Sequence, residues 1–287
     1  MSNFIEVRDV SKQYGDHVAL SHVNLSVPDG SIYGLLGPNG AGKTSLIRII
    51  NRITHADSGE VLMHGRPMTD DDIRQIGYLP EERGLYKKMK VEDEIIYLAR
   101  LRGLSRYDAM QRMGEWLERF DLGEWRNKKI EQLSKGMAQK VQFITTVIHR
   151  PPLLIFDEPF SGFDPVNAEQ LKREILRLRD EGAAILFSTH NMSSVEEVCQ
   201  EISLINHAEV VLQGTVEDIR RSYRSHKYTV QLENGDSFEY QLPEGTTLHD
   251  AIIDLNNQYP LAGIHEVLPT MQQIFMQAVG ATEYAES

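Results

Sequence analysis

Apolar residues along the chain fall into short runs, and longer segments with helical spacing lie between several of them. The runs are "FIEVRDV", "SIYGLLG", "IGYLP", "PLLIFDEP", "AAILFSTH" and "EISLINH", each ending at or near turn or polar residues. Continuous apolar runs of this length are typical of strands buried on both faces, and their alternation with helices favours a largely parallel sheet. The pattern predicts an α/β fold.

One stretch interrupts the alternation of strands and helices. From about residue 91 to 131 the chain has consecutive helical segments, "VEDEIIYLARLRG" and then "SRYDAMQRMGEWLERFDL", with no strand between them. We therefore expect a helical subdomain, at about residues 88–150, set into an α/β body that spans residues 1–215.

The pattern of predicted strands and helices changes again after about residue 215. "KYTVQLENGDSFEYQL" has two alternating runs around Asn234-Gly235, which is a strong hairpin signal. "TTLHDAIIDLNNQ" is helix-like, "IHEVL" strand-like, and "TMQQIFMQAVG" has the spacing of a final helix. Residues 216–287 are predicted to form a small α+β accessory domain.

Composition excludes several classes of function. The formal net charge of the 287 residues is −12, which disfavours a general electrostatic grip on nucleic acid. Cys199 is the single cysteine, so no intrachain disulfide exists and a reducing compartment fits best. No apolar run approaches the roughly 18 residues of a membrane span. We expect any association with a membrane to go through a partner.

The segment "GLLGPNGAGKTSLIRII" contains the phosphate-binding pattern Gly37-x-x-x-x-Gly42-Lys43-Thr44 between a strand-like run and a helix-like run. Glycines at these positions let backbone N–H groups curl around phosphates, while the lysine adds a cation and the threonine hydroxyl can ligate Mg²⁺. The segment predicts a nucleotide site.

Two acidic residues follow the buried run "PLLIF". Asp157 would lie at the carboxyl end of a strand, within reach of Mg²⁺, and Glu158 could orient or deprotonate an attacking water. His190 ends the run "AILFSTH", where it could bond a γ-phosphate. These residue types predict a nucleoside triphosphatase.

Taken in order, the phosphate loop, "LSKGM", "LLIFDE", "SGFD" and His190 resemble the nucleotide-binding subunit of an ATP-binding cassette (ABC) transporter, over roughly residues 3–215. The resemblance implies a P-loop NTPase fold, with ATP and Mg²⁺ as nucleotide and metal. It implies nucleotide binding by Tyr14, Gly37, Pro38, Asn39, Gly40, Ala41, Gly42, Lys43, Thr44 and Ser45, and by Ser134, Lys135, Gly136 and Met137 of a second subunit. It implies metal binding by Thr44, Asp157 and Glu81, and catalysis by Glu158, His190 and Glu81.

Three of these positions depart from the family's commonest pattern. Lys135 stands where the first of two glycines is usual, and Met137 stands where glutamine is usual. Lys135 either adds positive charge near phosphate or points into water. Glu81 in "GYLPEERGLY" occupies the place of a glutamine that touches Mg²⁺ and the attacking water. A carboxylate there could accept from a metal-bound water, but it adds negative charge beside the γ-phosphate.

The resemblance also implies partners. In such transporters the region of Arg83, Tyr86, Lys87 and Lys88 receives a membrane subunit, and "LPTMQQIF" in the tail resembles cassettes of ABC-2 exporters such as sodium and drug export systems. We therefore expect a homodimer or paired cassettes, an integral membrane permease, no nucleic acid, and a cytoplasmic location at the inner face of the cell membrane. Two alternative functions are considered. The first is a soluble cassette protein that acts on ribosomes or DNA. The second is a P-loop kinase or GTPase, but the sequence shows neither the acceptor pocket of a kinase nor the guanine-reading motif of a GTPase.

Overall fold

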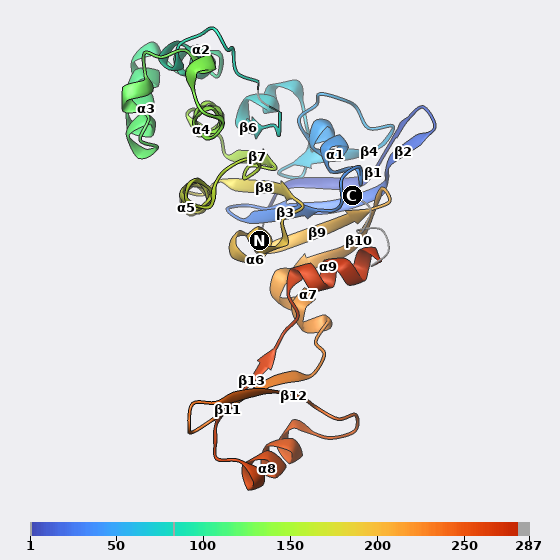
Figure 1. Cartoon of the computed structure of the whole chain (residues 1–287). Helices are drawn as coiled ribbons and strands as arrows, with labels where there is room; N and C mark the ends of the chain where they lie inside the picture. The colour runs from blue at the N-terminus through green and yellow to red at the C-terminus, as the bar shows by residue number, and fades with distance from the viewer. Residues whose placement is uncertain (1, 83, 281–287) are drawn as a thin grey trace. The chain divides into compact units, whose positions relative to one another are not determined.

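The computed structural model describes residues 2–82 and 84–280. The chain divides into two compact units, Met1–Gln213 and Gly214–Ser287. The first unit carries an α/β body with a helical insertion, and the second carries a small antiparallel sheet with helices (Figure 1).

A six-stranded sheet forms the centre of the first unit, in the order β10-β9-β3-β8-β7-β6. Its strands are β3 (Ile32–Leu36), β6 (Ile76–Leu79), β7 (Leu153–Asp157), β8 (Ala184–Thr189), β9 (Glu201–Asn206) and β10 (Glu209–Thr215). Strands β9, β3, β8, β7 and β6 pair in parallel, as predicted. Every residue of β3, β7 and β8 is buried, which explains their continuous apolar runs. The carboxyl ends of these strands share one edge.

The run "FIEVRDV" belongs to a second, antiparallel sheet with the order β2-β1-β4-β5. Its strands are β1 (Asn3–Tyr14), β2 (His17–Pro28), β4 (Ser58–Met63) and β5 (Arg66–Pro67). The expectation that this run joins the parallel strands was wrong. A two-residue turn separates Tyr14 from its partner His17, and a parallel connection needs a much longer crossover.

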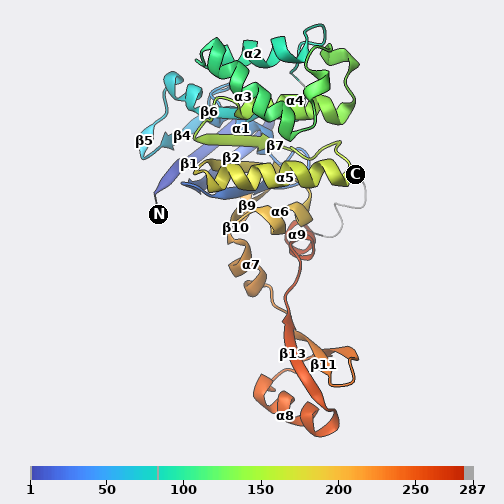
Figure 2. The same ribbon diagram turned by 90° about the vertical axis from the view of Figure 1, so that its left-hand side faces the viewer.

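Six α-helices and three short 3₁₀ helices complete the described part of the first unit. The α-helices are α1 (Lys43–Ile50), α2 (Val91–Leu101), α3 (Arg106–Arg119), α4 (Lys135–Val147), α5 (Pro165–Asp180) and α6 (Met192–Val198). The 3₁₀ helices are η1 (Asp70–Gln75), η2 (Gly123–Trp125) and η3 (Ile130–Gln132). Helices α2, α3 and α4 gather into one layer, while α5 runs along the sheet (Figure 2).

An aromatic series joins the helical layer to the sheet. Phe143 of α4 packs on Phe156 of β7, with ring centroids 5.5 Å apart. Trp116 of α3 and Phe120, which follows that helix, meet the same Phe143 ring edge-on at 5.9 and 5.8 Å. Such pairs stabilise packing beyond their buried area. They fix α4, and hence the segment that precedes it, against the strand that ends at Asp157.

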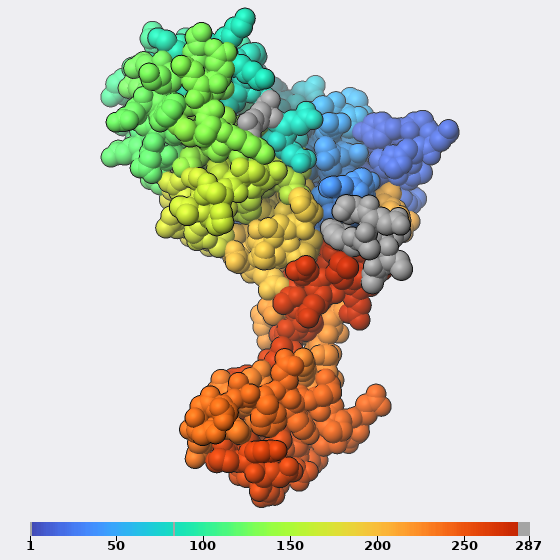
Figure 3. Space-filling model, viewed as in Figure 1, coloured from blue at the N-terminus to red at the C-terminus, as the bar shows by residue number. Residues whose placement is uncertain are grey.

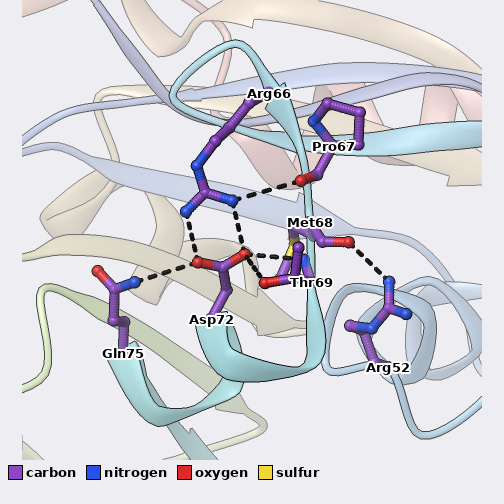
Figure 4. A network of polar contacts seen from close by, with 7 residues as sticks. All are labelled: Arg52, Arg66, Pro67, Met68, Thr69, Asp72 and Gln75. Carbon is purple, nitrogen blue, oxygen red and sulfur yellow. Dashed lines mark hydrogen bonds and ion pairs between the residues drawn. The ribbon is translucent and has the colours of Figure 1, made fainter.

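A polar network holds η1 against β5 (Figure 4). The buried carboxylate of Asp72 accepts two hydrogen bonds from the Arg66 guanidinium, at 2.6 and 2.8 Å. It also accepts from the backbone N–H and hydroxyl of Thr69, the residue before the helix. The Arg66 guanidinium holds the pKa of the Asp72 carboxyl well below its usual range.

The second unit contains a three-stranded antiparallel sheet in the order β12-β11-β13. Its elements are α7 (Val216–Ser222), β11 (Lys227–Leu232), β12 (Ser237–Gln241), α8 (Leu248–Gln258), β13 (Leu261–Val267) and α9 (Met271–Val279). The hairpin at Asn234-Gly235 is confirmed, since Gly235 has a φ of 90° between the paired strands. The orange part of the space-filling view, which belongs to this unit, is closely packed (Figure 3). Within residues 2–82 and 84–280, no helix combines the length and apolar character that crossing a membrane requires.

Candidate functional site

The phosphate loop connects β3 to α1 along a path that two glycines permit. Gly37 has a φ of 148°, and a Cβ built there would lie 2.2 Å from the carbonyl oxygen of Ile205. Gly42, the residue before α1, has a φ of 115°, and its Cβ would lie 2.2 Å from the carbonyl oxygen of Ala19. Side chains at either position would force the loop away from its neighbours.

Lys43 at the start of α1 is folded back on the phosphate loop. Its Nζ donates hydrogen bonds to the carbonyl oxygens of Gly37 at 2.6 Å and Pro38 at 3.0 Å. Burial lowers the pKa of the Lys43 ammonium, an effect that the nearby carboxylates of Glu158, Asp157 and Glu81 oppose. The ammonium could exchange its two carbonyl partners for phosphate oxygens without leaving the loop.

A cleft of about 200 Å³ lies over the loop and brings together residues from distant parts of the chain. Its lining residues are Tyr14, His17, Ala19, Asn39, Gly40, Gly42, Lys43, Thr44, Ser45, Glu81, Asp157 and Glu158. Gly37, Pro38 and Ala41 belong to the same loop behind this lining, where the N–H of Ala41 donates to the carbonyl oxygen of Pro38. The predicted adenine, phosphate and carboxylate positions therefore share one cleft.

Asp157 and Glu158 lie at the end of β7, both buried. Burial raises the pKa of the Asp157 carboxyl, and the neighbouring Glu158 and Glu81 charges raise it further. Glu158 has a φ of 49°, which is uncommon for a residue other than glycine. Its carboxylate lies 2.7 Å from Nδ1 of His190 and accepts from the hydroxyl of Thr189 at 3.1 Å. The strand end thus holds two acids, one against the phosphate loop and one paired with His190.

Comparison with known proteins decides the family. The ABC transporter family model matches residues 20–161. An uncharacterized ABC transporter ATP-binding protein YhaQ of Bacillus subtilis is 39% identical over 96% of this chain and 99% of its own length. The chain belongs to the ATP-binding proteins of ABC transporters. The predicted P-loop NTPase fold is confirmed by an ATP-binding subunit of an ABC transporter, which has a TM-score of 0.72 and 32% identity over 77% of this chain and 93% of its own.

The name of a second relative states what that protein helps to transport. The lantibiotic transport ATP-binding protein SrtF of Streptococcus pyogenes is 32% identical over 73% of this chain and 90% of its own length. ABC ATPases of this kind bind ATP, in general with Mg²⁺.

The cleft fits a magnesium nucleotide. Mg²⁺ is usually held by one or two protein groups together with phosphate oxygens and water. Within the described ranges no cluster of three or more His, Cys, Asp or Glu side chains could hold a metal by itself. Thr44 and Asp157 both line the cleft, so this ABC protein offers a hydroxyl and a buried carboxylate beside the place where phosphates would lie.

The segment "LSKGM" begins α4, as predicted. Ser134 precedes the helix, and its hydroxyl accepts from the backbone N–H of Met137 at 3.2 Å. Ser134 and Lys135 are exposed, and Gly136 leaves room for close approach, since a Cβ there would meet nothing nearer than 3.9 Å. None of residues 134–137 lines the cleft of its own chain.

Sequence reasoning missed two contributors. His17 lines the cleft beside Tyr14 because the β1–β2 turn pairs these two residues. The short turn "YGDH" is the sequence feature from which this pairing could have been predicted. Gln142 of α4 donates hydrogen bonds to the carbonyl oxygens of Pro80 and Glu82, both at 3.2 Å. Gln142 thereby fixes the backbone on either side of Glu81. No local sequence pattern predicts such a contact.

Proposed function

We propose that the chain is the ATP-hydrolysing subunit of an ABC transporter and drives export through a separate membrane permease. The convergence of the phosphate loop, Asp157 and Glu158 in one cleft supports this proposal most strongly. Relatives named for transport, including lantibiotic transport, favour an exporter.

In the proposed reaction, Glu158 takes a proton from the water that attacks the γ-phosphate. Lys43 stabilises negative charge on the β/γ oxygens after leaving its two carbonyl partners. Tyr14, which is 44% exposed at the cleft rim, stacks on adenine. Thr44, Asp157 and Glu81 line the cleft and would hold Mg²⁺, which would supply further charge neutralisation. His190, paired with Glu158, contacts the γ-phosphate.

The second half of the site comes from another copy or a paired cassette. Ser134, Lys135, Gly136 and Met137 surround an exposed helix N-terminus, which favours an anion through its unpaired N–H groups and dipole. We propose that this end of α4 closes over the γ-phosphate bound to the partner's phosphate loop.

Mixing two inactive variants tests both proposals together. Ser134→Arg should block its partner's site, and Glu158→Gln should lack the base. In a mixed dimer, the Ser134→Arg chain supplies an intact Glu158 and the Glu158→Gln chain supplies an intact Ser134. These two residues meet in one of the two sites, so that site is complete and ATP hydrolysis should return. If the Ser134→Arg variant is fully active, or if the mixture stays as inactive as each variant, the site does not form between chains.

The permease contact is proposed at the segment after Glu81. Tyr86 is 55% exposed and lies edge-on to Tyr97 of α2, with ring centroids 6.2 Å apart. Lys87 and Lys88 follow it, whereas Arg83 lies outside the described residues. We propose a cytoplasmic protein held at the inner membrane face through this contact. Co-expression with a six-span membrane protein encoded in an adjacent reading frame should make the chain sediment with membranes. A chain that stays in the supernatant would favour a soluble cassette.

The proposed accessory domain covers residues 216–287, and we propose that it helps to pair cassettes, as in ABC-2 exporters. The YhaQ relative aligns over nearly the whole of this chain, which supports a role that includes the tail. Removing residues 216–287 should weaken self-association more than ATP binding.

A further inference from the structure

The first turns of α4 contact the loop that follows Glu158 in the same chain. The side-chain amide of Gln139 donates a hydrogen bond to the carbonyl oxygen of Ser161. This contact also orients the amide, because a flipped Gln139 would face the Ser161 carbonyl with its own oxygen. The helix that offers Ser134 to a partner is therefore bonded to its own chain beside the acid pair.

Lys135 makes a second contact with this loop. Gly162 has a φ of 78°, and a Cβ built there would lie 2.4 Å from Cε and 2.5 Å from Nζ of Lys135. The lysine side chain thus fills the space that a side chain at position 162 would take. A cation is disfavoured at a helix N-terminus, so the packing of its methylene groups on the loop, rather than its charge, accounts for this placement.

The loop is tied back to the proposed base. The N–H of Ser161 donates to the carbonyl oxygen of Glu158 at 3.0 Å. Glu158 keeps its uncommon φ of 49° only while its surroundings hold it there. Gln139 also borders a small cavity of about 10 Å³ that Glu81, Asp157 and Glu158 line. A shift of α4 would consequently reach the Glu158 backbone through Ser161.

We propose that Gln139 and Lys135 are positioning residues for Glu158 of their own chain. The proposal rests on the proposed function of Glu158, and it names the contacts that hold this residue from α4 through Ser161 and Gly162.

Four variants of the full-length chain test these contacts. Gln139→Leu removes the amide donor, and Lys135→Ala removes the methylene chain; both should lower kcat on the order of tenfold. KM for ATP should stay within about twofold in Gln139→Leu, because Gln139 neither lines the cleft nor belongs to the proposed partner contact at residues 134–137. Lys135→Met keeps an unbranched chain without the charge and should lose clearly less kcat than Lys135→Ala, because the chain still fills the space beside Gly162. The double variant Lys135→Ala/Gln139→Leu should lose less than the product of the two single effects, since both act on one loop.

Thermal unfolding and ATP titration of each variant separate a folding defect from a loss of positioning. Wild-type kcat in both Gln139→Leu and Lys135→Ala would overturn the proposal, provided that Glu158→Gln is inactive in the same assay. An equal loss in Lys135→Met and Lys135→Ala would assign the effect to charge and would also overturn it. A wild-type chain without ATP hydrolysis would refute the proposed function itself, and the positioning role with it.

Discussion

Oε1 of Glu158 lies 2.8 Å from the backbone nitrogen of His190 and 2.7 Å from its Nδ1. Oε2 of the same carboxylate accepts from the hydroxyl of Thr189 at 3.1 Å. The proposed base is therefore docked at the end of β8, with both oxygens bonded to residues of its own chain. The histidine ring is 53% exposed and the carboxylate 9%, so the ring can move more easily than the acid.

Removing the ring tests the importance of this pair. His190→Ala keeps the backbone N–H bond but loses the Nδ1 contact. We expect kcat for ATP hydrolysis to fall roughly 10- to 100-fold, because the ring orients the base, with a smaller loss of ATP affinity from its proposed contact with the γ-phosphate. Thr189→Val serves as the matched control for the other oxygen and should lose less activity. A His190→Ala variant with wild-type kcat would show that the pair has no part in hydrolysis.

The buried Lys43 ammonium predicts a pH dependence of nucleotide affinity. Burial lowers the pKa of Lys43 below its ordinary value of 10.5, whereas bound phosphate favours the charged form and would raise this pKa again. ATP affinity should therefore be full below the pKa of the free site and should decline as the pH rises through it. Titration of the ATP Kd across the alkaline range checks this. Lys43→Met should bind weakly without that decline, and a decline of the same size in the variant would contradict the assignment.

The Arg66–Asp72 pair predicts a stability effect away from the cleft. Asp72→Asn replaces a buried carboxylate that accepts from Arg66 and Thr69, so the free energy of unfolding should fall by about 1–3 kcal/mol. Since the pKa of the Asp72 carboxyl is lowered on folding, its contribution is present above the unfolded pKa of about 3.9 and is lost as the pH falls. Urea unfolding at neutral and acidic pH measures this.

The matched variant for that measurement is Arg66→Met, which leaves the buried Asp72 carboxylate without its charged partner and should cost at least as much stability as Asp72→Asn. If the free energies of unfolding of Asp72→Asn and the wild type differ by the same amount at neutral and at acidic pH, the charge of the Asp72 carboxylate does not stabilise the fold.

Cys199 offers a reporter of unfolding. Its thiol is buried, and burial raises its pKa far above the ordinary value, so Ellman's reagent should react with the unfolded chain only. Gly34 on β3 packs against it, because a Cβ at Gly34 would lie 3.1 Å from Sγ of Cys199 and 2.9 Å from Cγ2 of Ile202. Gly34→Ala should speed the reaction by loosening this packing. Fast labelling of the native wild type would contradict the buried position.

Local sequence signals predicted the elements that rest on local rules. Ser134 is found before α4 because its hydroxyl satisfies a free N–H, and Gly235 is found in its hairpin because the turn needs a positive φ. The sheet assignment of β1 was missed, since an apolar run does not reveal which strands it will pair with. The Gln142 and Gln139 contacts join segments distant along the chain, so they depend on tertiary packing that no local pattern encodes.

The central claim is that two chains enclose ATP and that Glu158 then drives hydrolysis. The most direct test is the molar mass of the Glu158→Gln variant with and without Mg-ATP, measured by light scattering after size exclusion, together with its turnover. We expect a stable dimer in the presence of Mg-ATP, which Ser134→Arg in the same chain abolishes, and no detectable hydrolysis. A Glu158→Gln variant that remains monomeric with Mg-ATP bound and hydrolyses it near the wild-type rate would show that neither the shared site nor the role of Glu158 is correct.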